Sequence, residues 1–158
     1  MQVRLMTESS QVQERVILLL RRKFLELDLD VRIPPPVFTA MQGSVIAFDG
    51  VNHTMQARFP VTESTLNPFG NMQGGMIAAA IDNTLGPLSM LAAPPNYTRN
   101  LEIKYRRPVS GGTEYLDVHC RLEERKNRQL IFSAIVTDAD GEEFASARAV
   151  HWILEMKK

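Results

Sequence analysis

The sequence is poor in the residues that would tie it to several common classes of protein. Its 158 residues include one cysteine, Cys120, so no internal disulfide can form, and chains without disulfides are typical of reducing compartments. Basic and acidic side chains number 18 each, which leaves no net positive charge to attract a polyanion. We therefore expect a cytoplasmic protein of one domain's length that does not bind nucleic acid.

Long apolar runs are missing as well. The run VILLL at residues 16–20 is followed at once by Arg21, Arg22 and Lys23. A membrane-spanning helix needs about 20 apolar residues and a signal-peptide core about 7–15. We expect a soluble protein with no membrane span.

The N-terminal part of the chain has a helical pattern. Ser10 precedes Gln13 at the spacing of a capping box, and apolar residues recur at helical intervals as far as Leu27. This predicts an amphipathic helix over residues 10–27. Residues 32–36 end in three prolines, which favour an extended connector. We therefore divide the chain into residues 1–42, a helix with a proline-rich strap, and residues 43–158, the main domain.

From residue 43 the apolar period changes to two. Val45 and Ala47 precede a turn at residues 49–52, and a second alternating segment follows it, which predicts a hairpin. Four more alternating segments lie at residues 101–105, 116–122, 130–136 and 144–154, the last two joined by a turn at residues 138–141. Between them, residues 76–93 predict a buried helix that Pro87 kinks or divides. The order predicts an α+β fold, with a mainly antiparallel sheet wrapped on one long helix.

One carboxylate interrupts this apolar helix. Asp82 is the only charged residue between Gly74 and Pro95, and an ionised carboxylate in an apolar interior is costly unless it is paired. Two interpretations remain open: a buried structural aspartate bound by an arginine or by backbone amides, or a general base or nucleophile whose pKa is set by partial burial.

Gly74 and Gly75 lie where the same helix should begin. Amide groups in a first helical turn lack intrahelical partners and can polarise a carbonyl, and glycine lets a substrate approach the backbone closely; the alternative is ordinary turn chemistry. Eight residues of helix separate Gly74 from Asp82 by roughly 12 Å. If both act on one carbonyl, they come from two antiparallel copies of the helix, which predicts a symmetric dimer with shared sites.

The spacing of these residues resembles that of hotdog-fold acyl-CoA thioesterases of the phenylacetyl-CoA thioesterase-like branch. The matching positions are Asn67, Gly70, Gly74, Gly75 and Asp82. The segment TRNLEIKYRRP at residues 98–108 resembles the strand that follows the family's helix. The resemblance covers about residues 43–155. Gln73 stands where the family motif has histidine; it can donate a hydrogen bond but cannot titrate near neutral pH.

The resemblance implies a curved sheet around a central helix, homodimers or homotetramers, and hydrolysis of an acyl-CoA thioester without a metal or cofactor. Asp82 would activate water or attack the thioester carbon, and the Gly74 amide of the opposite subunit would polarise the carbonyl oxygen. Asn67 would help to hold the water or thioester, although a turn residue is the simpler interpretation. Thr98 falls where the family often has serine or threonine near the aspartate.

Other side chains have a functional and a structural interpretation. Arg106 and Arg107 could meet coenzyme A phosphates or belong to a solvated strand face. Met72, together with Met76 and Met90, could line an acyl pocket or simply fill the core.

The three histidines, His53, His119 and His151, fall in separate predicted strands without metal-ligand spacing, and strand or core roles are expected for them. Cys120 alternates with apolar residues and is expected to be a small buried hydrophobe.

Two other functions can be compared with hydrolysis. A protein that binds acyl-CoA or a related thioester without turning it over is an alternative that Gln73 favours. Hydration or dehydration of an acyl thioester is disfavoured, because the site region offers no histidine to pair with the acid.

Overall fold

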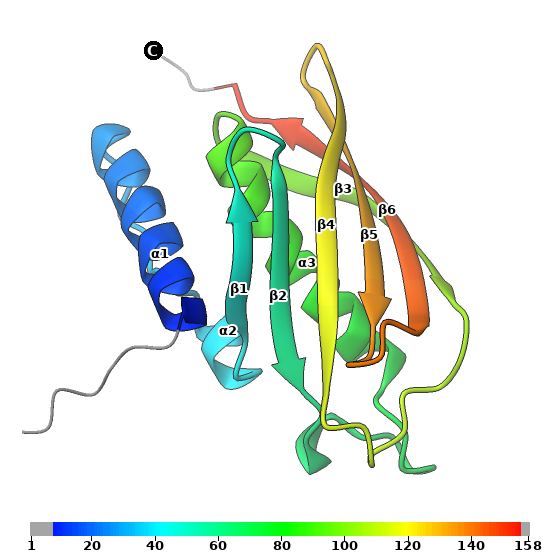
Figure 1. The fold of residues 1–158 in the computed structure, drawn as a ribbon. Coiled ribbons are helices and arrows are strands. Elements are labelled where there is room, and N and C mark those ends of the chain that lie inside the picture. The colour runs from blue at the N-terminus through cyan, green and yellow to red at the C-terminus, as the bar shows by residue number, and fades with distance from the viewer. Residues whose placement is uncertain (1–7, 156–158) are drawn as a thin grey trace, which may run out of the picture.

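A curved antiparallel sheet wraps around a long helix in the computed structural model, which describes residues 8–155 (Figure 1). The sheet has six strands in the order β1-β2-β4-β5-β6-β3, and each is antiparallel to its neighbours. Their bounds are Ser44–Asp49 (β1), Thr54–Pro60 (β2), Asn96–Tyr105 (β3), Tyr115–Lys126 (β4), Gln129–Thr137 (β5) and Glu143–Ile153 (β6). The ends of the two predicted units, residues 1–7 and 156–158, lie outside the described residues.

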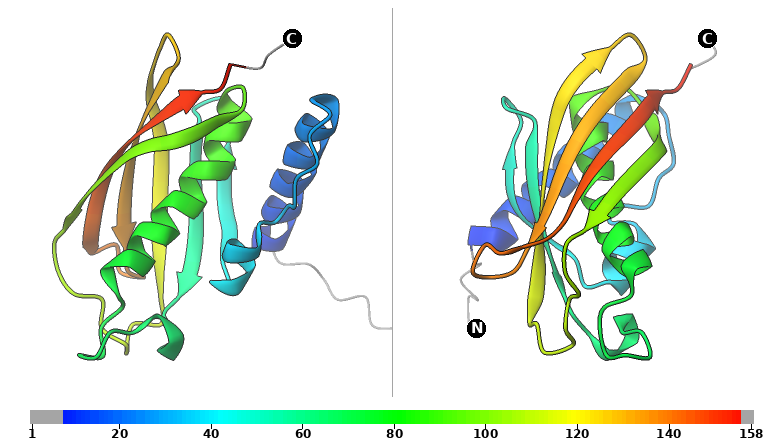
Figure 2. Two further views of the ribbon diagram at one scale, coloured as in Figure 1. Left: turned by 180° about the vertical axis from the view of Figure 1, so that it is seen from behind. Right: turned by 90° about the vertical axis from the view of Figure 1, so that its right-hand side faces the viewer.

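The long helix α3, Gly74–Ala92, lies in the concave face of the sheet (Figure 2). Ile81, Leu85 and Leu88 on its inner side are fully buried, as are Phe59 and Phe132 of the sheet. These side chains form one core cluster. The predicted α+β hotdog architecture, with a curved antiparallel sheet around a central helix, is confirmed.

Pro87 does not divide α3, so of the two predicted effects of this proline, division is wrong and a kink stays a prediction. The helix runs without a break through Pro87 to Ala92. Proline costs a helix about 3 kcal/mol, but Leu85 and Leu88 on either side of it are fully buried, and burying each such side chain is worth about 1.5–3 kcal/mol. Core packing therefore outweighs the missing backbone hydrogen bond.

Helix α1, Glu8–Glu26, packs beside β1 at one edge of the sheet (Figure 2). It begins before Ser10, so the predicted capping box is wrong. The Gln13 side chain instead accepts a hydrogen bond from the Val45 amide, with Oε1 2.8 Å from N. Lys23 donates to the carbonyls of Met90 and Ala93, and this ties α1 to the last turn of α3.

The connector after α1 differs from the prediction at its end. Pro36 begins a short helix, α2 (Pro36–Ala40), instead of extending the strap. Proline fits the first turn of a helix because it has no N–H to leave unpaired and its φ angle is already helical.

The first hairpin is confirmed, with two local differences. A bulge between Val45 and Ala47 leaves Ala47 exposed and turns Phe48 toward the core, so the predicted alternation fails at Ala47. His53 lies in the turn with φ 50°, not in a strand. Asp49 holds this turn by accepting hydrogen bonds from the amides of Val51 and Asn52.

Among residues 8–155, no helix is both long and apolar enough to cross a membrane.

Candidate active site

Asp82 lies on the open side of α3, which faces away from the sheet. In the protomer it is exposed, so the expected burial is wrong: the residues around it in sequence are apolar, but Gly75 and Asp82 share the uncovered side of the helix. Its Oδ1 accepts a hydrogen bond of 2.7 Å from the Thr98 hydroxyl. The predicted proximity of Thr98 to the aspartate is thus present in the structure.

The hydrogen bonds continue from Thr98 into the protein. Thr98 Oγ1 lies 3.2 Å from His151 Nε2, and His151 Nδ1 lies 2.9 Å from Asn96 Oδ1. Asn96 and His151 are buried, at 4% and 1% exposure. Asp82, Thr98, His151 and Asn96 therefore form a linear series, the polar chain, which runs from the surface of α3 across β3 to β6.

Asn96 fixes the tautomer of the imidazole. Its side-chain nitrogen donates to the carbonyl oxygens of Ser89 and Pro94, at 3.2 and 2.9 Å, so Oδ1 must face His151. An amide oxygen only accepts hydrogen bonds, and His151 Nδ1 therefore carries the proton. In the neutral ring Nε2 is left as an acceptor beside the Thr98 hydroxyl.

The expectation that the site region offers no histidine is wrong. His151 pairs directly with Thr98 in the register of β3 and β6, and sequence alone does not give that register. Burial lowers the pKa of His151, and the negative charge of Asp82 acts in the opposite direction. Because His151 is sealed from solvent, it cannot face a substrate as the base of a dehydratase or reach a leaving thiolate.

The start of α3 carries the two glycines. Gly74 is the first helical residue, and the Tyr105 hydroxyl donates to its carbonyl at 2.8 Å. A Cβ on Gly74 would meet the Tyr105 ring at 3.4 Å. Tyr105 is 51% exposed and reaches the helix from β3. Gln73 is the exposed N-cap residue, and its side chain does not cap the helix.

Asn67 organises the loop that leads into α3. Its side-chain Oδ1 accepts hydrogen bonds from the amides of Phe69 and Asn71, at 2.9 and 3.2 Å. Gly70, with φ 76°, adopts the left-handed conformation that glycine favours in the same loop. These contacts account for Asn67 as a turn residue, and its role toward a substrate stays a prediction.

A cavity of about 350 Å³ opens beside Asp82, between α3 and the N-terminal segment. Its wall is mostly apolar. On α3 it is lined by Asp82, Asn83, Gly86, Pro87 and Met90, and on the other side by residues of α1, the proline strap and α2, including Ile17, Leu20, Phe24, Ile33 and Phe38. Sequence reasoning missed this role of the N-terminal helix. Of the three methionines discussed with the pocket, Met90 lines the cavity, whereas Met72 is buried in the core and Met76 packs against it.

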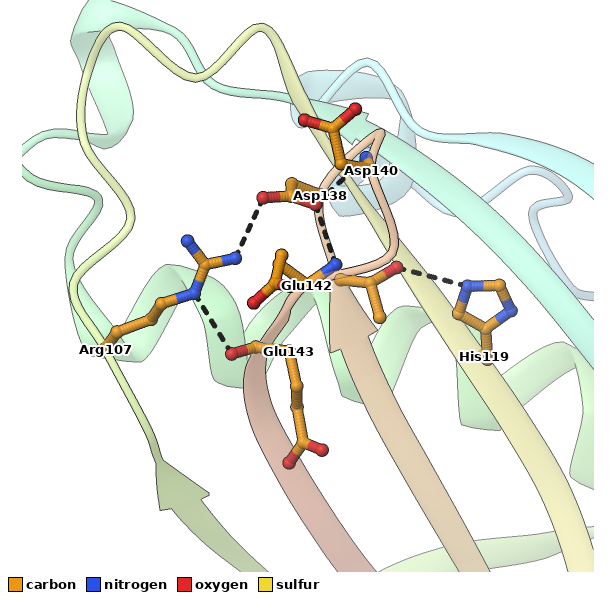
Figure 3. Close-up of polar contacts among 7 residues, drawn as sticks. Arg107, His119, Asp138, Asp140, Glu142 and Glu143 are labelled. Carbon is orange, nitrogen blue, oxygen red and sulfur yellow. Dashed lines mark hydrogen bonds and ion pairs between the residues drawn. The ribbon is translucent and has the colours of Figure 1, made fainter.

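Arg106 and Arg107 are engaged within the protein at the turn between β5 and β6. Arg107 Nη2 lies 2.8 Å from Asp138 Oδ2, and its Nε donates to the Glu143 carbonyl (Figure 3). Arg106 Nε lies 3.1 Å from Glu143 Oε1. The ion pair with Arg107 lowers the pKa of Asp138. A coenzyme A phosphate at either arginine would compete with these carboxylates.

The remaining candidates have structural surroundings. Cys120 is buried in the core, and burial raises its thiol pKa. His119 is exposed, with Nε2 3.4 Å from the Thr137 hydroxyl (Figure 3). Within the described part of the chain, no three His, Cys, Asp or Glu side chains are arranged to hold a metal ion.

The family model described as "Thioesterase superfamily" matches residues 69–145. A putative thioesterase from Ralstonia eutropha JMP134, described as phenylacetic acid degradation-related, is 25% identical, with a TM-score of 0.71 over 84% of this chain and 98% of that one. The E. coli PaaI protein from the phenylacetic acid degradation operon is 12% identical, with a TM-score of 0.73 over 89% and 96%.

The protein smu.793 from Streptococcus mutans UA159, solved bound to acetyl CoA, is 19% identical, with a TM-score of 0.68 over 82% of this chain and 97% of that one. No curated protein sequence matches the chain. The matched segment, 69–145, contains the glycines and Asp82, and the surrounding sheet and helix have the arrangement of the solved relatives. Over residues 69–145 the chain is therefore similar to the thioesterase superfamily, and its fold is the hotdog fold of the solved relatives.

Proposed function

We propose that the protein hydrolyses an acyl-CoA thioester, with Asp82 as the general base. The observation that carries the proposal is the position of this carboxylate, hydrogen-bonded to Thr98 in the wall of an apolar cavity. The Streptococcus mutans relative bound to acetyl CoA supports coenzyme A as the carrier of the acyl group.

Asp82 is suited to activating water. Thr98 binds Oδ1, and no hydrogen bond from residues 8–155 reaches Oδ2, so Oδ2 can accept a proton from water. The water oxygen then bonds to the thioester carbon, and the Gly74 amide stabilises the negative charge on the carbonyl oxygen. When the C–S bond breaks, the thiolate of coenzyme A takes the proton from Asp82. The products are the free acid and the thiol.

The cavity beside Asp82 fits the acyl group. At about 30 Å³ for each group, the volume of one water molecule in the liquid, the cavity has room for roughly ten groups of methylene size. In this proposal the N-terminal unit, residues 1–42, supplies one wall of the acyl site of the domain at 43–158. Met90 lines the opposite wall, on α3, and Gly75 at the exposed start of α3 lets the thioester approach the backbone.

A dimer completes the site. Gly74 and Asp82 lie about 12 Å apart along one helix, too far for both to act on one carbonyl, and the side of α3 that bears Asp82 is uncovered in the protomer. Strand β3 is an edge of the sheet, and an unpaired edge is a ready site for pairing with another strand. Two copies joined along β3, with their α3 helices antiparallel, would bring Gly74 of one subunit to Asp82 of the other.

The direct test is hydrolysis of a panel of acyl-CoA esters by the wild type and by Asp82→Asn. Loss of a general base costs at least ~100-fold in kcat, while KM should change little. Asp140→Asn is the control, because Asp140 is an exposed aspartate of the β5–β6 turn (Figure 3) and does not line the cavity beside Asp82. Equal rates for wild type and Asp82→Asn would refute the proposal.

A thioester-binding protein without turnover remains the second candidate, favoured by Gln73 in place of histidine. The same panel separates the two functions. Binding of acyl-CoA by calorimetry, with no release of thiol from any ester in the panel, would select the binding protein.

A further inference from the structure

We propose that His151 is a positioning residue that controls the Asp82 base through the Thr98 hydroxyl, with Asn96 holding the imidazole in the required tautomer. The inference rests on the proposed function in taking Asp82 as the base. The inference goes beyond the proposed function in assigning a role to a buried histidine that no substrate touches.

The polar chain has fewer protons than acceptors at Thr98. Thr98 has one hydroxyl proton and two acceptors beside it, Asp82 Oδ1 at 2.7 Å and His151 Nε2 at 3.2 Å. Because Asn96 keeps the proton of neutral His151 on Nδ1, Nε2 has none of its own. One proton therefore serves two acceptors whenever Asp82 is ionised and His151 is neutral.

A proton on His151 Nε2 removes this competition. The Nε2–H group then donates to Thr98 Oγ1, and the Thr98 hydroxyl must donate to Asp82. The carboxylate gains a full hydrogen bond and a cation two hydrogen bonds away, and both stabilise its negative charge. The Thr98 hydroxyl is consequently committed to Asp82 when His151 is charged, and it is shared with the imidazole when His151 is neutral, which leaves the carboxylate more available to a water proton.

The surroundings of His151 make Asp82 its electrostatic partner. From β3 it meets Asn96 and Thr98, which do not titrate. From β5 it meets the Phe132 ring, at 4.9 Å between centroids, and pairs with Leu130. Asp82 of α3 is the group whose charge acts on the ring. Burial lowers the pKa of His151, so the neutral ring predominates at neutral pH and the charged ring appears only as the pH falls.

The first test needs no activity. The imidazole titration of His151 is followed by NMR in the wild type, in Asp82→Asn and in Thr98→Val, and the His151 signal is assigned by its loss in His151→Gln. Asp82→Asn should lower the pKa of His151, because it removes the negative charge that raises it. Thr98→Val keeps the side-chain shape and should also move the titration, since it removes the hydroxyl between the two groups. Identical titrations in all three proteins would overturn the inference.

The second test is the pH dependence of kcat. In the wild type, the pH profile of kcat should contain a step at which His151 loses its proton, with kcat higher above the step. In His151→Gln no imidazole titrates, so this step should vanish, and the plateau should fall by about tenfold because the ring no longer positions the Thr98 hydroxyl. In Thr98→Val the further change His151→Gln should have no additional effect, whereas Thr98→Ser should restore the step.

These outcomes separate the two proposals. If no ester is hydrolysed but the NMR titrations shift as expected, the proposed function fails and the coupling stands. The positioning role is refuted if hydrolysis requires Asp82 but the pH profile of His151→Gln still contains the step. It is also refuted if the losses of kcat in His151→Gln and in Thr98→Val simply add in the double variant.

Discussion

Gly74 supplies the backbone amide that the proposed mechanism places at the carbonyl oxygen. It opens α3, where the N–H groups have no partner within the helix, and its own carbonyl is held by Tyr105. The preceding residue, Gln73, has φ −57° and ψ 133°, a conformation that a following proline accepts. The amide can therefore be removed without breaking the helix.

We expect Gly74→Pro to lower kcat by about 100-fold or more, because it deletes the N–H that stabilises the charged oxygen. Proline is well tolerated at the first helical position, so the thermal unfolding temperature should change little. The control is Gly74→Ala, which keeps the N–H and adds a methyl group at 3.4 Å from Tyr105. Steady-state kinetics on one acyl-CoA ester measures both variants. Equal losses in the two would show that the added side chain, and not the amide, matters.

At the scale of elements, the site depends on how α1 and α3 face each other. Lys23 of α1 holds the last turn of α3, and the cavity lies between the two helices. Gly86 is the smallest of the α3 residues that line this cavity. A Cβ added there would meet no atom within 4 Å, so a larger side chain at this position projects into open space.

Gly86→Leu should therefore shorten the acyl site without unfolding the helix, since leucine favours helix over glycine by up to ~1 kcal/mol. We expect kcat/KM for esters of about eight carbons or more to fall, by about fourfold for each methylene that is displaced, while acetyl-CoA keeps its wild-type value. Gly86→Ala is the control and should leave the chain-length profile nearly unchanged. A uniform loss across all chain lengths would place the acyl group elsewhere.

The sequence predicted the elements better than the contacts between them. The period-two pattern located the strands, whereas the reaction centre inferred from Asp82 and the two glycines stays a prediction. The predictions failed where tertiary packing decides: the unbroken course of α3 through Pro87, the exposure of Asp82, and the capping box at Ser10. His151 could not be assigned, because its contact with Thr98, 53 residues away in the sequence, depends on the register of β3 and β6.

At the scale of the whole molecule, the proposed site belongs to a pair of chains. A protomer offers Asp82 at one point of α3 and Gly74 at another, with the open side of the helix and the edge strand β3 between it and a second copy. Mixed dimers of two inactive variants distinguish this arrangement from a monomer and from a dimer in which each site is built from one chain.

Two inactive variants should restore activity when mixed. Gly74→Pro and Asp82→Asn are unfolded together in equal amounts and refolded. About half of the dimers then contain one chain of each kind, and one of their two sites combines an intact Gly74 with an intact Asp82. The mixture should therefore recover about a quarter of the wild-type activity. Each variant refolded alone is the control. No recovery, with mixed dimers demonstrated by differently tagged chains, would show that each site is built from one chain.

The carbonyl groups at the end of α3 serve two parts of the molecule at once. Lys23 binds those of Met90 and Ala93, and Asn96 binds those of Ser89 and Pro94. The first pair holds the wall of the cavity beside Asp82, and the second fixes which nitrogen of His151 carries its proton. Cavity shape and the His151 tautomer therefore depend on one backbone segment, and a change in the course of residues 89–94 is expected to alter both, whereas a substitution at Gly86 or at His151 alters one alone.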